Sequence, residues 1–362
     1  MFKSSRQDKI LLVLVILVLL IRLFSMNEGL VEKYYTYGFY PVISEFLRLL
    51  FGFLPFSFGD LLYVAAIIYI VAKGWKLARQ IRRKTVRRSL PAFLKKLVSI
   101  ALAIYIVFNI FWGLNYDRQG ISYQLGLEVK PYTLTDLDTI TNLLQQKLNG
   151  TAVLLEPTQR EKLNSNRTLA REGVAAFVIA GKKYTFLQYE NPSIKPSLFS
   201  HIGHFFGFTG YYNPFSGEAQ IKTTVPFFLK PFVLTHEIGH QLGYAKENEA
   251  NFVSFFACRS SANAEFRYSV YYEMYQYAIR ELTKRDSVLA RNYKDKLLPQ
   301  VKRDNEEFRR YLERSANPIE PFVSAFYGGY LRMNNQPKGK DTYDEVVAWL
   351  IAYQKKYGPG SI

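Results

Sequence analysis

Two of the four histidines in the chain lie four residues apart, in the sequence FVLTHEIGHQLGYAKENEANFVSFFAC. On an α-helix, side chains four positions apart project from one face, so His236 and His240 can share one cation. Glu237 lies one position round the helix, within hydrogen-bonding reach of a water molecule on that cation. Zinc lowers the pKa of a bound water toward ~7, and a neighbouring glutamate can take its proton. The spacing therefore predicts metal-assisted hydrolysis, with Glu237 as the general base.

The residues around these histidines are all uncharged: Val233, Leu234, Ile238, Gly239, Gln241 and Leu242. A buried metal-binding helix needs such neighbours, because a further charge would compete with the ion or be stranded in a low dielectric. The alternative is a surface helix with two exposed histidines, but it does not explain why so apolar a segment contains His-Glu-His. We therefore predict one bound Zn²⁺, although this ligand set would accept several divalent ions.

A catalytic zinc site needs a third protein ligand and leaves its fourth position to water. No histidine follows His240, and Lys246 occupies the position where a metzincin-like pattern would place one. The third ligand should then be a carboxylate from the sequence ENEANF, which follows at once. Glu247 is the favoured ligand, and Glu249 is the alternative if the second helix begins late. Both glutamates also suit a helix N-terminus, where negative charge is favourable.

This stretch resembles gluzincin-type metallopeptidases, in which a glutamate on the next helix, in the pattern E-x-x-A-D/N, is the third metal ligand. Here the pattern reads Glu-Asn-Glu-Ala-Asn from Glu247 to Asn251. The resemblance implies that Glu247 binds the metal and that Asn251, one turn further on, orients a ligand histidine.

Most of the chain resembles an uncharacterised family of bacterial membrane proteins with a gluzincin-like domain outside the cytoplasm. Three further stretches carry this resemblance: WGLNYDR, GYYNPFSGEAQI and YLRMNNQPKG. It implies a peptidase fold, and we expect the substrate to be a peptide or protein. In gluzincin folds an edge strand before the metal helix pairs with the substrate backbone. YYNPFSGEAQI is the candidate for that strand, and a structural loop is the equal alternative.

Zinc peptidases also need a hydrogen-bond donor for the oxyanion that forms on the attacked carbonyl. No histidine remains downstream, so we expect a tyrosine, with Tyr330 as the first choice and Tyr327 behind it. Packing is the commoner role for any one of the 27 tyrosines. His201 and His204 could form a second, weak metal site, although such a pair more often simply lies in a loop near the active cleft.

The net charge of +17 is confined mainly to two clusters. Residues 73–96 contain ten Lys or Arg and no Asp or Glu, and residues 1–9 add two net positive charges, which leaves +5 for the rest. A charge this high would usually suggest nucleic acid, but each cluster lies next to an apolar run. The pattern therefore predicts a lipid bilayer as partner and argues against nucleic acid.

Three apolar runs, residues 10–26, 57–72 and 97–114, approach the ~20 residues that cross a bilayer. Each alone could be a buried core helix, and the first could be a signal peptide, but no small-residue cleavage site follows it. Three runs beside dense basic clusters favour spanning helices. By the positive-inside rule, the N-terminus and the basic loop 73–96 are cytoplasmic.

The sequence thus predicts two regions. Residues 1–114 form an α-helical membrane region with three transmembrane helices, and its connection 27–56 rests on the outer membrane surface. Residues 115–362 form an α+β, mostly helical zincin-like metallopeptidase domain outside the cytoplasm. The single cysteine, Cys258, cannot form an intrachain disulfide and should pack inside a helix as a small apolar residue.

Within the second region, TLTDLDTITNLLQQKLNG predicts an amphipathic helix ending at Gly150, with Thr135 or Asp136 as its cap. The stretch GVAAFVIAGKKYTFLQYE could be strand or helix. The pattern from Pro231 onward predicts helices over residues 232–242, 247–261, 264–282, about 287–313 and 342–357.

The leading hypothesis is a membrane-anchored zinc metallopeptidase of the cell membrane. One alternative is a weakly active or inactive sensor or scaffold that keeps the zincin fold and signals across the membrane. Another is an intramembrane protease, but the apolar run around the metal helix is interrupted by Lys230 and is too short to span a bilayer.

Overall fold

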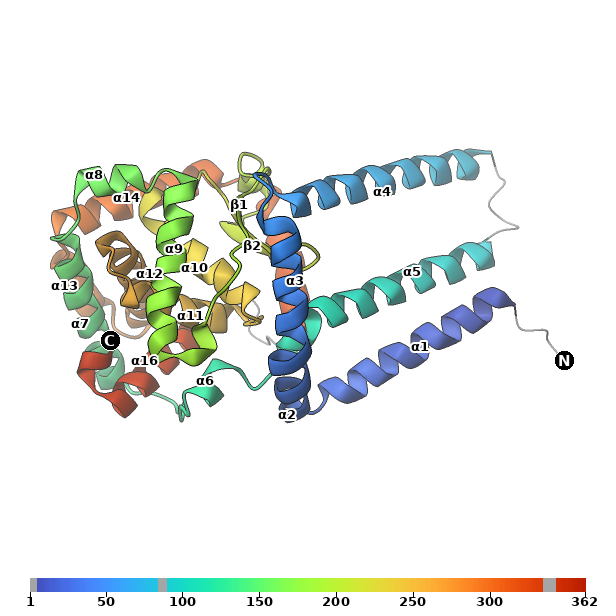
Figure 1. Cartoon of the computed structure of the whole chain (residues 1–362). Helices are drawn as coiled ribbons and strands as arrows, with labels where there is room; N and C mark the ends of the chain where they lie inside the picture. Colours follow the sequence, from blue (N-terminus) through green and yellow to red (C-terminus); the bar gives the residue numbers. More distant parts are fainter. Residues whose placement is uncertain (1–4, 84–89, 335–342) are drawn as a thin grey trace.

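The computed structural model describes residues 5–83, 90–334 and 343–362, and it is mostly helical. Three long helices extend from one side of a globular body: α1 (Arg6–Ser25), α4 (Phe58–Arg82) and α5 (Leu90–Phe111) (Figure 1). The three apolar runs of the sequence lie in these helices. The predicted basic loop is partly helical, because α4 continues to Arg82, and its residues 84–89 lie outside the described part of the chain.

Two of these helices contain segments long and apolar enough to cross a membrane, Phe58–Gln80 and Pro91–Phe111. The helix Arg6–Ser25 qualifies only together with the helical stretch Glu28–Gly52, against which it is bent by 95°. The described residues therefore hold two or three candidate spans, which is compatible with a membrane protein.

The bent stretch comprises α2 (Glu28–Leu30), the π-helical segment Val31–Phe39 and α3 (Tyr40–Gly52). In Figure 1 it runs across the base of the long helices, between them and the globular body. One side of it is buried against the body, and the other side exposes Tyr34, Phe46 and further apolar residues. This is the segment for which the sequence predicts a position on a membrane surface.

The globular body is built around α12 (Ala264–Arg285), which packs against α7 (Leu134–Ala152) and α11 (Glu247–Ser260). Around them lie further helices: α6 (Gly120–Gln124), α8 (Pro157–Lys162), α9 (Asn166–Lys183), α10 (Lys230–Gln241), α13 (Ser287–Asp295), α14 (Pro299–Ser315), α15 (Glu320–Met333) and α16 (Tyr343–Tyr357). One buried apolar core joins α7, α9, α10, α11, α12 and α16. Cys258 is fully buried in α11 as a free thiol, as predicted.

Several helix predictions need correction. The cap of α7 is Thr133, because its hydroxyl accepts from the backbone of Asp136 while that aspartate accepts from the backbone of Thr133. This is a capping box. The stretch 173–190, which could be strand or helix, lies in helix α9 as far as Lys183, and the rest is a short 3₁₀ helix and irregular chain. The helix expected over 287–313 is two helices, α13 and α14, because Pro299 cannot continue the first and instead opens the second. Helix α15 was not expected.

A three-stranded sheet lies between these helices and the long ones, in the order β1-β3-β2. β1 (Ile194–Pro196) pairs parallel with β3 (Glu218–Ile221), and β2 (Gly210–Asn213) pairs antiparallel with it. The stretch YYNPFSGEAQI is thus a hairpin, with β2 at the edge and β3 in the centre. Because α10 packs on both strands, the sheet and the histidine helix are held together.

Candidate metal centre

Two consecutive helices and the tight turn between them position the candidate ligands. Helix α10 begins with Pro231 in its first turn, which suits a helix start. It ends at Gln241, and Gly243, two residues further on, has a φ of +87°, a left-handed conformation that favours glycine. A side chain there would also press on the ring of Tyr40. The chain then reverses and α11 begins at Glu247, which brings this glutamate back over His236.

The three predicted ligands converge. One ligand atom from each of His236, His240 and Glu247 lies within 4.8 Å of the others, and among the described residues they form the one such group. The Nε2 atom of His236 is 3.2 Å from Oε2 of Glu247. The two imidazole rings are 4.7 Å apart and perpendicular. The side chains therefore meet at a common point.

The other ring nitrogen of each histidine is already occupied. Nδ1 of His236 is 2.8 Å from Oδ1 of Asn251, and Nδ1 of His240 is 2.7 Å from the carbonyl oxygen of Tyr244. Because both partners are acceptors, each Nδ1 carries a proton, which leaves Nε2 as the ring nitrogen available to a cation. The orienting role that the resemblance implied for Asn251 matches this contact. The carbonyl of Tyr244 has no signal in the sequence, because any residue supplies one.

Burial shifts the titration of these groups. It raises the pKa of Glu237 to about 8, and Oε2 of this carboxylate, within the described residues, has no hydrogen-bond partner. Burial lowers the pKa of His240 to about 4. Burial also acts to lower the pKa of His236, but the hydrogen bond and charge of Glu247 outweigh it and raise the pKa to about 9. In the metal-free protein, a proton between Nε2 of His236 and Oε2 of Glu247 therefore occupies the place of the expected cation.

The second glutamate of ENEANF lies elsewhere. Glu249 packs against Gly120, where a side chain would collide with its carboxylate, and it lies near the charge of Arg118. Its carboxylate is not part of the three-ligand group. The geometry therefore matches Glu247, the favoured ligand, over Glu249.

The two tyrosines singled out in the sequence both lie at the centre. The hydroxyl of Tyr327 donates to Oε1 of Glu247 at 2.6 Å. The ring of Tyr330 stacks on that of Tyr327, and its hydroxyl is 3.5 Å from that of Tyr116. Tyr327 therefore contacts the ligand carboxylate directly, and Tyr330 lies one turn away. The role of Tyr330 as oxyanion donor stays a prediction.

The histidines and Glu237 lie in a cleft of about 860 Å³. Its walls come from β2 and the loop before it, from α12, from α15, and from the ends of α4 and α5 nearest the globular body. Most lining side chains are aromatic or aliphatic, a composition typical of ligand pockets.

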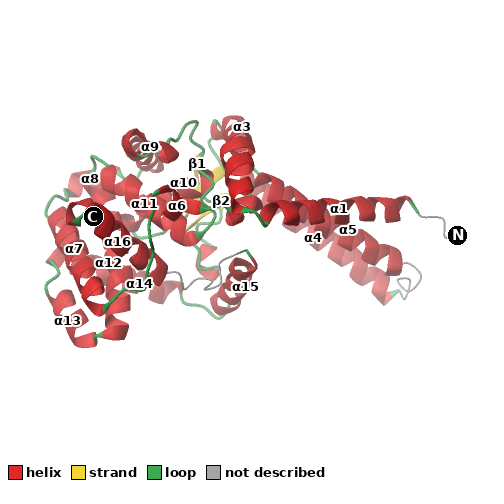
Figure 2. Cartoon of the chain, turned by 90° about the horizontal axis from the view of Figure 1, so that it is seen from below, coloured by secondary structure: helices red, strands yellow, loops and turns green. Residues whose placement is uncertain are grey.

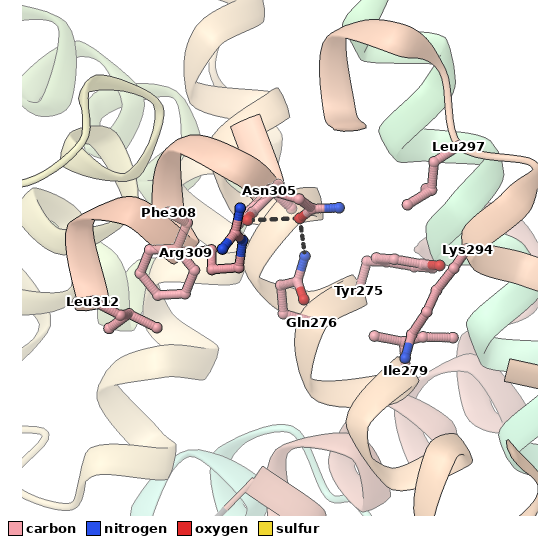
Figure 3. Close-up of a pocket in the computed structure, with 10 residues that line it drawn as sticks. Tyr275, Gln276, Ile279, Lys294, Leu297, Asn305, Phe308, Arg309 and Leu312 are labelled. Atoms are coloured by element: carbon pink, nitrogen blue, oxygen red, sulfur yellow. Dashed lines mark hydrogen bonds between the residues drawn. The ribbon is translucent and has the colours of Figure 1, made fainter. Parts of the chain in front are cut away.

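A second cavity, of about 290 Å³, lies between α12, α13 and α14 (Figure 3). Figure 3 shows Gln276 and Asn305 bonded across it, at 2.8 Å. The described residues that line it include no His, Asp, Glu or Cys. It shares Gln276 and Phe308 with the larger cleft, so it adjoins the cleft without offering ligands of its own.

The stretch WGLNYDR, noted only for its resemblance, packs around α10 and the turn after it. The ring of Trp112 meets that of His240 edge-on, with centroids 5.8 Å apart. Arg118 is buried, bonds the carbonyl of Gly243 and forms a salt bridge of 3.0 Å with Glu32. Sequence reasoning missed these supporting roles, because nothing in the local pattern links them to a helix more than 100 residues later.

His201 and His204 do not join the three-ligand group. Nδ1 of His204 is 3.0 Å from the hydroxyl of Ser315 and 3.3 Å from the ammonium of Lys222. A positive charge at that distance opposes a second metal ion. His204 lies in the short 3₁₀ helix Gly203–Phe205, and His201 lies in the turn before it.

Comparison with known proteins supports the uncharacterised family. No curated protein and no solved structure matches the chain. A family model described as "Protein of unknown function (DUF3810)" matches residues 35–351, a stretch that includes His236, Glu237, His240 and Glu247. The gluzincin relation stays a prediction. Since the match covers most of its length, the chain belongs to this DUF3810 family.

Proposed function

We propose that this protein is a membrane-anchored zinc metallopeptidase that hydrolyses peptide bonds outside the cytoplasm. The observation that carries the proposal is the convergence of His236, His240 and Glu247 beside the buried carboxylate of Glu237. In this proposal α1, α4 and α5 cross the membrane. The positive-inside rule then puts the N-terminus and the basic segment after α4 in the cytoplasm and the cleft on the other side.

The donor set suits zinc. Two neutral imidazole nitrogens and one carboxylate oxygen are the ligands of many catalytic zinc sites. Both Nδ1 atoms are held by acceptors, so the rings are already oriented with Nε2 toward the common point. The unpartnered Oε2 of Glu237 supports the same assignment, since a buried polar atom is costly unless a ligand satisfies it. His236, His240 and Glu247 would hold the ion.

Bound zinc would supply Lewis acidity, lowering the pKa of a coordinated water and polarising the scissile carbonyl. Glu237 takes a proton from the attacking water and passes it to the leaving nitrogen as the C–N bond breaks. The water oxygen ends in the new carboxylate, and the amine leaves with the proton. Tyr330 is the proposed donor to the oxyanion, and Tyr327 holds Glu247 in place.

The edge strand supports a polypeptide substrate. Lys222 donates its backbone N–H to the carbonyl of Thr209, so by the antiparallel alternation Tyr211 and Asn213 also bond toward β3. The N–H and C=O groups of Gly210 and Tyr212 then point the other way, and both residues line the cleft. An extended peptide can pair with them by β-augmentation.

The test uses the full chain purified in lipid nanodiscs. Glu237→Gln should keep zinc, measured by elemental analysis, and lose hydrolysis of a random peptide library, read by mass spectrometry. Glu247→Gln should lose zinc and activity together, whereas the matched Glu249→Gln should keep stoichiometric zinc. A wild-type protein that binds no zinc, or that cleaves no better than Glu237→Gln, would overturn the proposal.

A second candidate is a sensor that signals through the long helices. It is favoured by one observation: the backbone N–H groups of Phe58 and Gly59, in the first turn of α4, donate to Glu218 of the sheet. A change in the sheet on ligand binding in the cleft would then be transmitted directly to α4. The output of a sensor should survive Glu237→Gln, whereas the output of a peptidase should not.

A further inference from the structure

We propose that the substrates of this site are membrane-anchored polypeptides, cut a few residues outside the bilayer. The inference rests on the proposed function and names its substrate class. Three features carry it: the end of the cleft built by the long helices, the course of the edge strand, and the apolar side chains at the rim.

One end of the cleft is formed by the long helices themselves. Tyr63 of α4 and Phe108 of α5 line it, together with Trp112 just after α5. Tyr63 and Phe108 belong to the two segments that are long and apolar enough to cross a membrane. Aromatic side chains gather where spanning helices leave the bilayer. A polypeptide that enters at this end therefore comes from the membrane boundary.

The edge strand leads from this boundary to the catalytic glutamate. Asn213, at one end of β2, packs against Gly59 in the first turn of α4. Gly210, at the other end, lies so close to Glu237 that a Cβ there would be 2.6 Å from Oε1. At ~3.3 Å per residue, the three-residue step between them spans about 10 Å. A chain paired with β2 therefore passes Glu237 about 10 Å from the start of α4.

The side of the cleft formed by α12 carries charged and amide groups beside the rings of Tyr277 and Phe308. Glu273, Gln276 and Arg280, all on α12, line it. Charged and amide side chains suit a hydrated polypeptide and not a lipid tail. The charged lining residues of α12 thus lie away from the long helices, whose lining residues are aromatic. This order fits a chain that passes from a membrane into water.

The rim next to the long helices carries large exposed apolar side chains. On α15, Phe322 is 78% exposed and Phe326 82% exposed, and Leu198 and Phe206 before β2 are about half exposed. Exposed apolar groups gathered in this way mark an interaction surface. Figure 2 shows α15 and α3 on either side of the base of the long helices.

The position of the rim indicates that its exposed apolar side chains contact the bilayer. Helix α15 is joined to α5 by the rings of Phe108 and Tyr330, whose centroids are 6.3 Å apart. The rim therefore lies where the candidate span in α5 ends, and the membrane surface continues into the mouth of the cleft. A substrate held in the same membrane meets the mouth without leaving the lipid.

The experiment compares the cleavage rates of substrates that are all anchored in a membrane but differ in the distance between the span and the cut site. Full-length protein is reconstituted in vesicles with synthetic single-span peptides that carry a randomised ten-residue segment. In the near library this segment follows the span directly, and in the far library a 30-residue Gly/Ser linker separates them by about 30 Å. A third library has no span. Each library is made in both chain orientations, and products are read by mass spectrometry against Glu237→Gln.

The near library should be cleaved at least about tenfold faster than the far library, with cuts within about six residues of the span. Attachment alone cannot produce this ratio, because both libraries are anchored. Equal rates for near and far, or faster cleavage of the free library, overturn the inference and leave the peptidase intact. Cleavage of no library above Glu237→Gln overturns both.

A rim variant gives a second readout. Phe326→Ser should reduce the near-to-far ratio, because the mouth then loses its contact with the membrane. The control is Val288→Ser, which removes an apolar side chain that is 69% exposed on α13, outside the cleft. An unchanged ratio in Phe326→Ser, with both variants folded, contradicts the role of the rim.

Discussion

At the scale of single residues, the candidate centre is organised by what surrounds the ligands. Asn251 and the carbonyl of Tyr244 fix the two imidazole rings, and Tyr327 fixes Glu247. None of these three groups needs to contact an ion to affect metal affinity. Each removes rotational freedom that the ligands would otherwise lose on binding, so each should tune metal affinity.

Asn251→Ala should weaken zinc binding by roughly ten- to a hundredfold, the range typical when a partner of a ligand histidine is removed. The physical reason is that Nδ1 of His236 loses its acceptor and the ring loses its orientation. Competition with a zinc chelator measures the change. Asn248→Ala is the matched control on the same helix, because Asn248 bonds Glu345 and not a histidine. Equal affinities for the two variants would contradict this prediction.

Metal affinity should depend on pH in a defined direction. The pKa of His236 in the metal-free protein is raised to about 9, so below that pH a proton occupies the nitrogen that must bind the ion. Binding must displace it. The association constant should therefore rise about tenfold per pH unit between about 6 and 8 and flatten near 9. Calorimetry in buffers of different ionisation enthalpy should count at least one released proton, and a flat profile would contradict this.

At the scale of elements, α3 supports the end of the histidine helix from outside. The hydroxyl of Tyr40 donates to the carbonyls of His240 and Gln241, at 3.3 and 3.0 Å. Ser44 and Arg48 bond the carbonyl of Gln241 as well. These carbonyls lie in the last turn of α10, where a helix leaves acceptors without internal partners. Helix α3 thus acts as a cap that is remote in sequence.

Tyr40→Phe should lower the thermal unfolding midpoint of the metal-free protein. Both carbonyls keep other donors, Ser44 and Arg48 for Gln241 and the backbone N–H of Gly243 for His240. The change therefore removes one hydrogen bond without leaving a bare acceptor, which costs about 0.5–1.5 kcal/mol, and each kcal/mol corresponds to roughly 2–4 °C in the unfolding midpoint. Tyr34→Phe is the control, since Tyr34 lies on the same segment but is exposed. Differential scanning calorimetry in nanodiscs measures both, and identical midpoints would rule out the capping role.

The sequence predicts some of these elements and not others. The helices around His236 and Glu247 follow from apolar periodicity, and their observed ends differ by one or two residues from the expected ones. The break at Pro299 was missed because charged periodicity continues across it, although proline alone gives the reason for a break. The contact of Tyr40 with α10 joins residues 200 apart, and local patterns carry no information on such pairs.

At the scale of the whole molecule, the first 114 residues and the globular body share one interface. A second apolar cluster contains Val31, Tyr35, Tyr40 and Trp112 from the first 114 residues. It also contains Tyr116, Tyr212 and Ala245 from the body. The buried salt bridge between Glu32 and Arg118 crosses the same interface. The boundary expected at residue 114 therefore runs through a packed core.

Residues 115–362 expressed alone should be unstable. Without Glu32, the buried guanidinium of Arg118 loses its charge partner, and breaking a buried pair costs about 3–5 kcal/mol. The carbonyls at the end of α10 lose their donors as well. Limited proteolysis should digest this fragment under conditions in which the full chain in nanodiscs stays intact. A fragment as resistant as the full chain would show that the body folds independently.

The distance in sequence between Tyr40 and the carbonyl of His240 has a consequence for biosynthesis. Helix α3 leaves the ribosome about 200 residues before its partner. At ~5–20 residues per second, this delay is on the order of 10 to 40 s. During that time Tyr40, Ser44 and Arg48 lack the carbonyl of Gln241 to which they donate in the folded chain. The support that α3 gives to α10 can therefore form only after translation has passed residue 241.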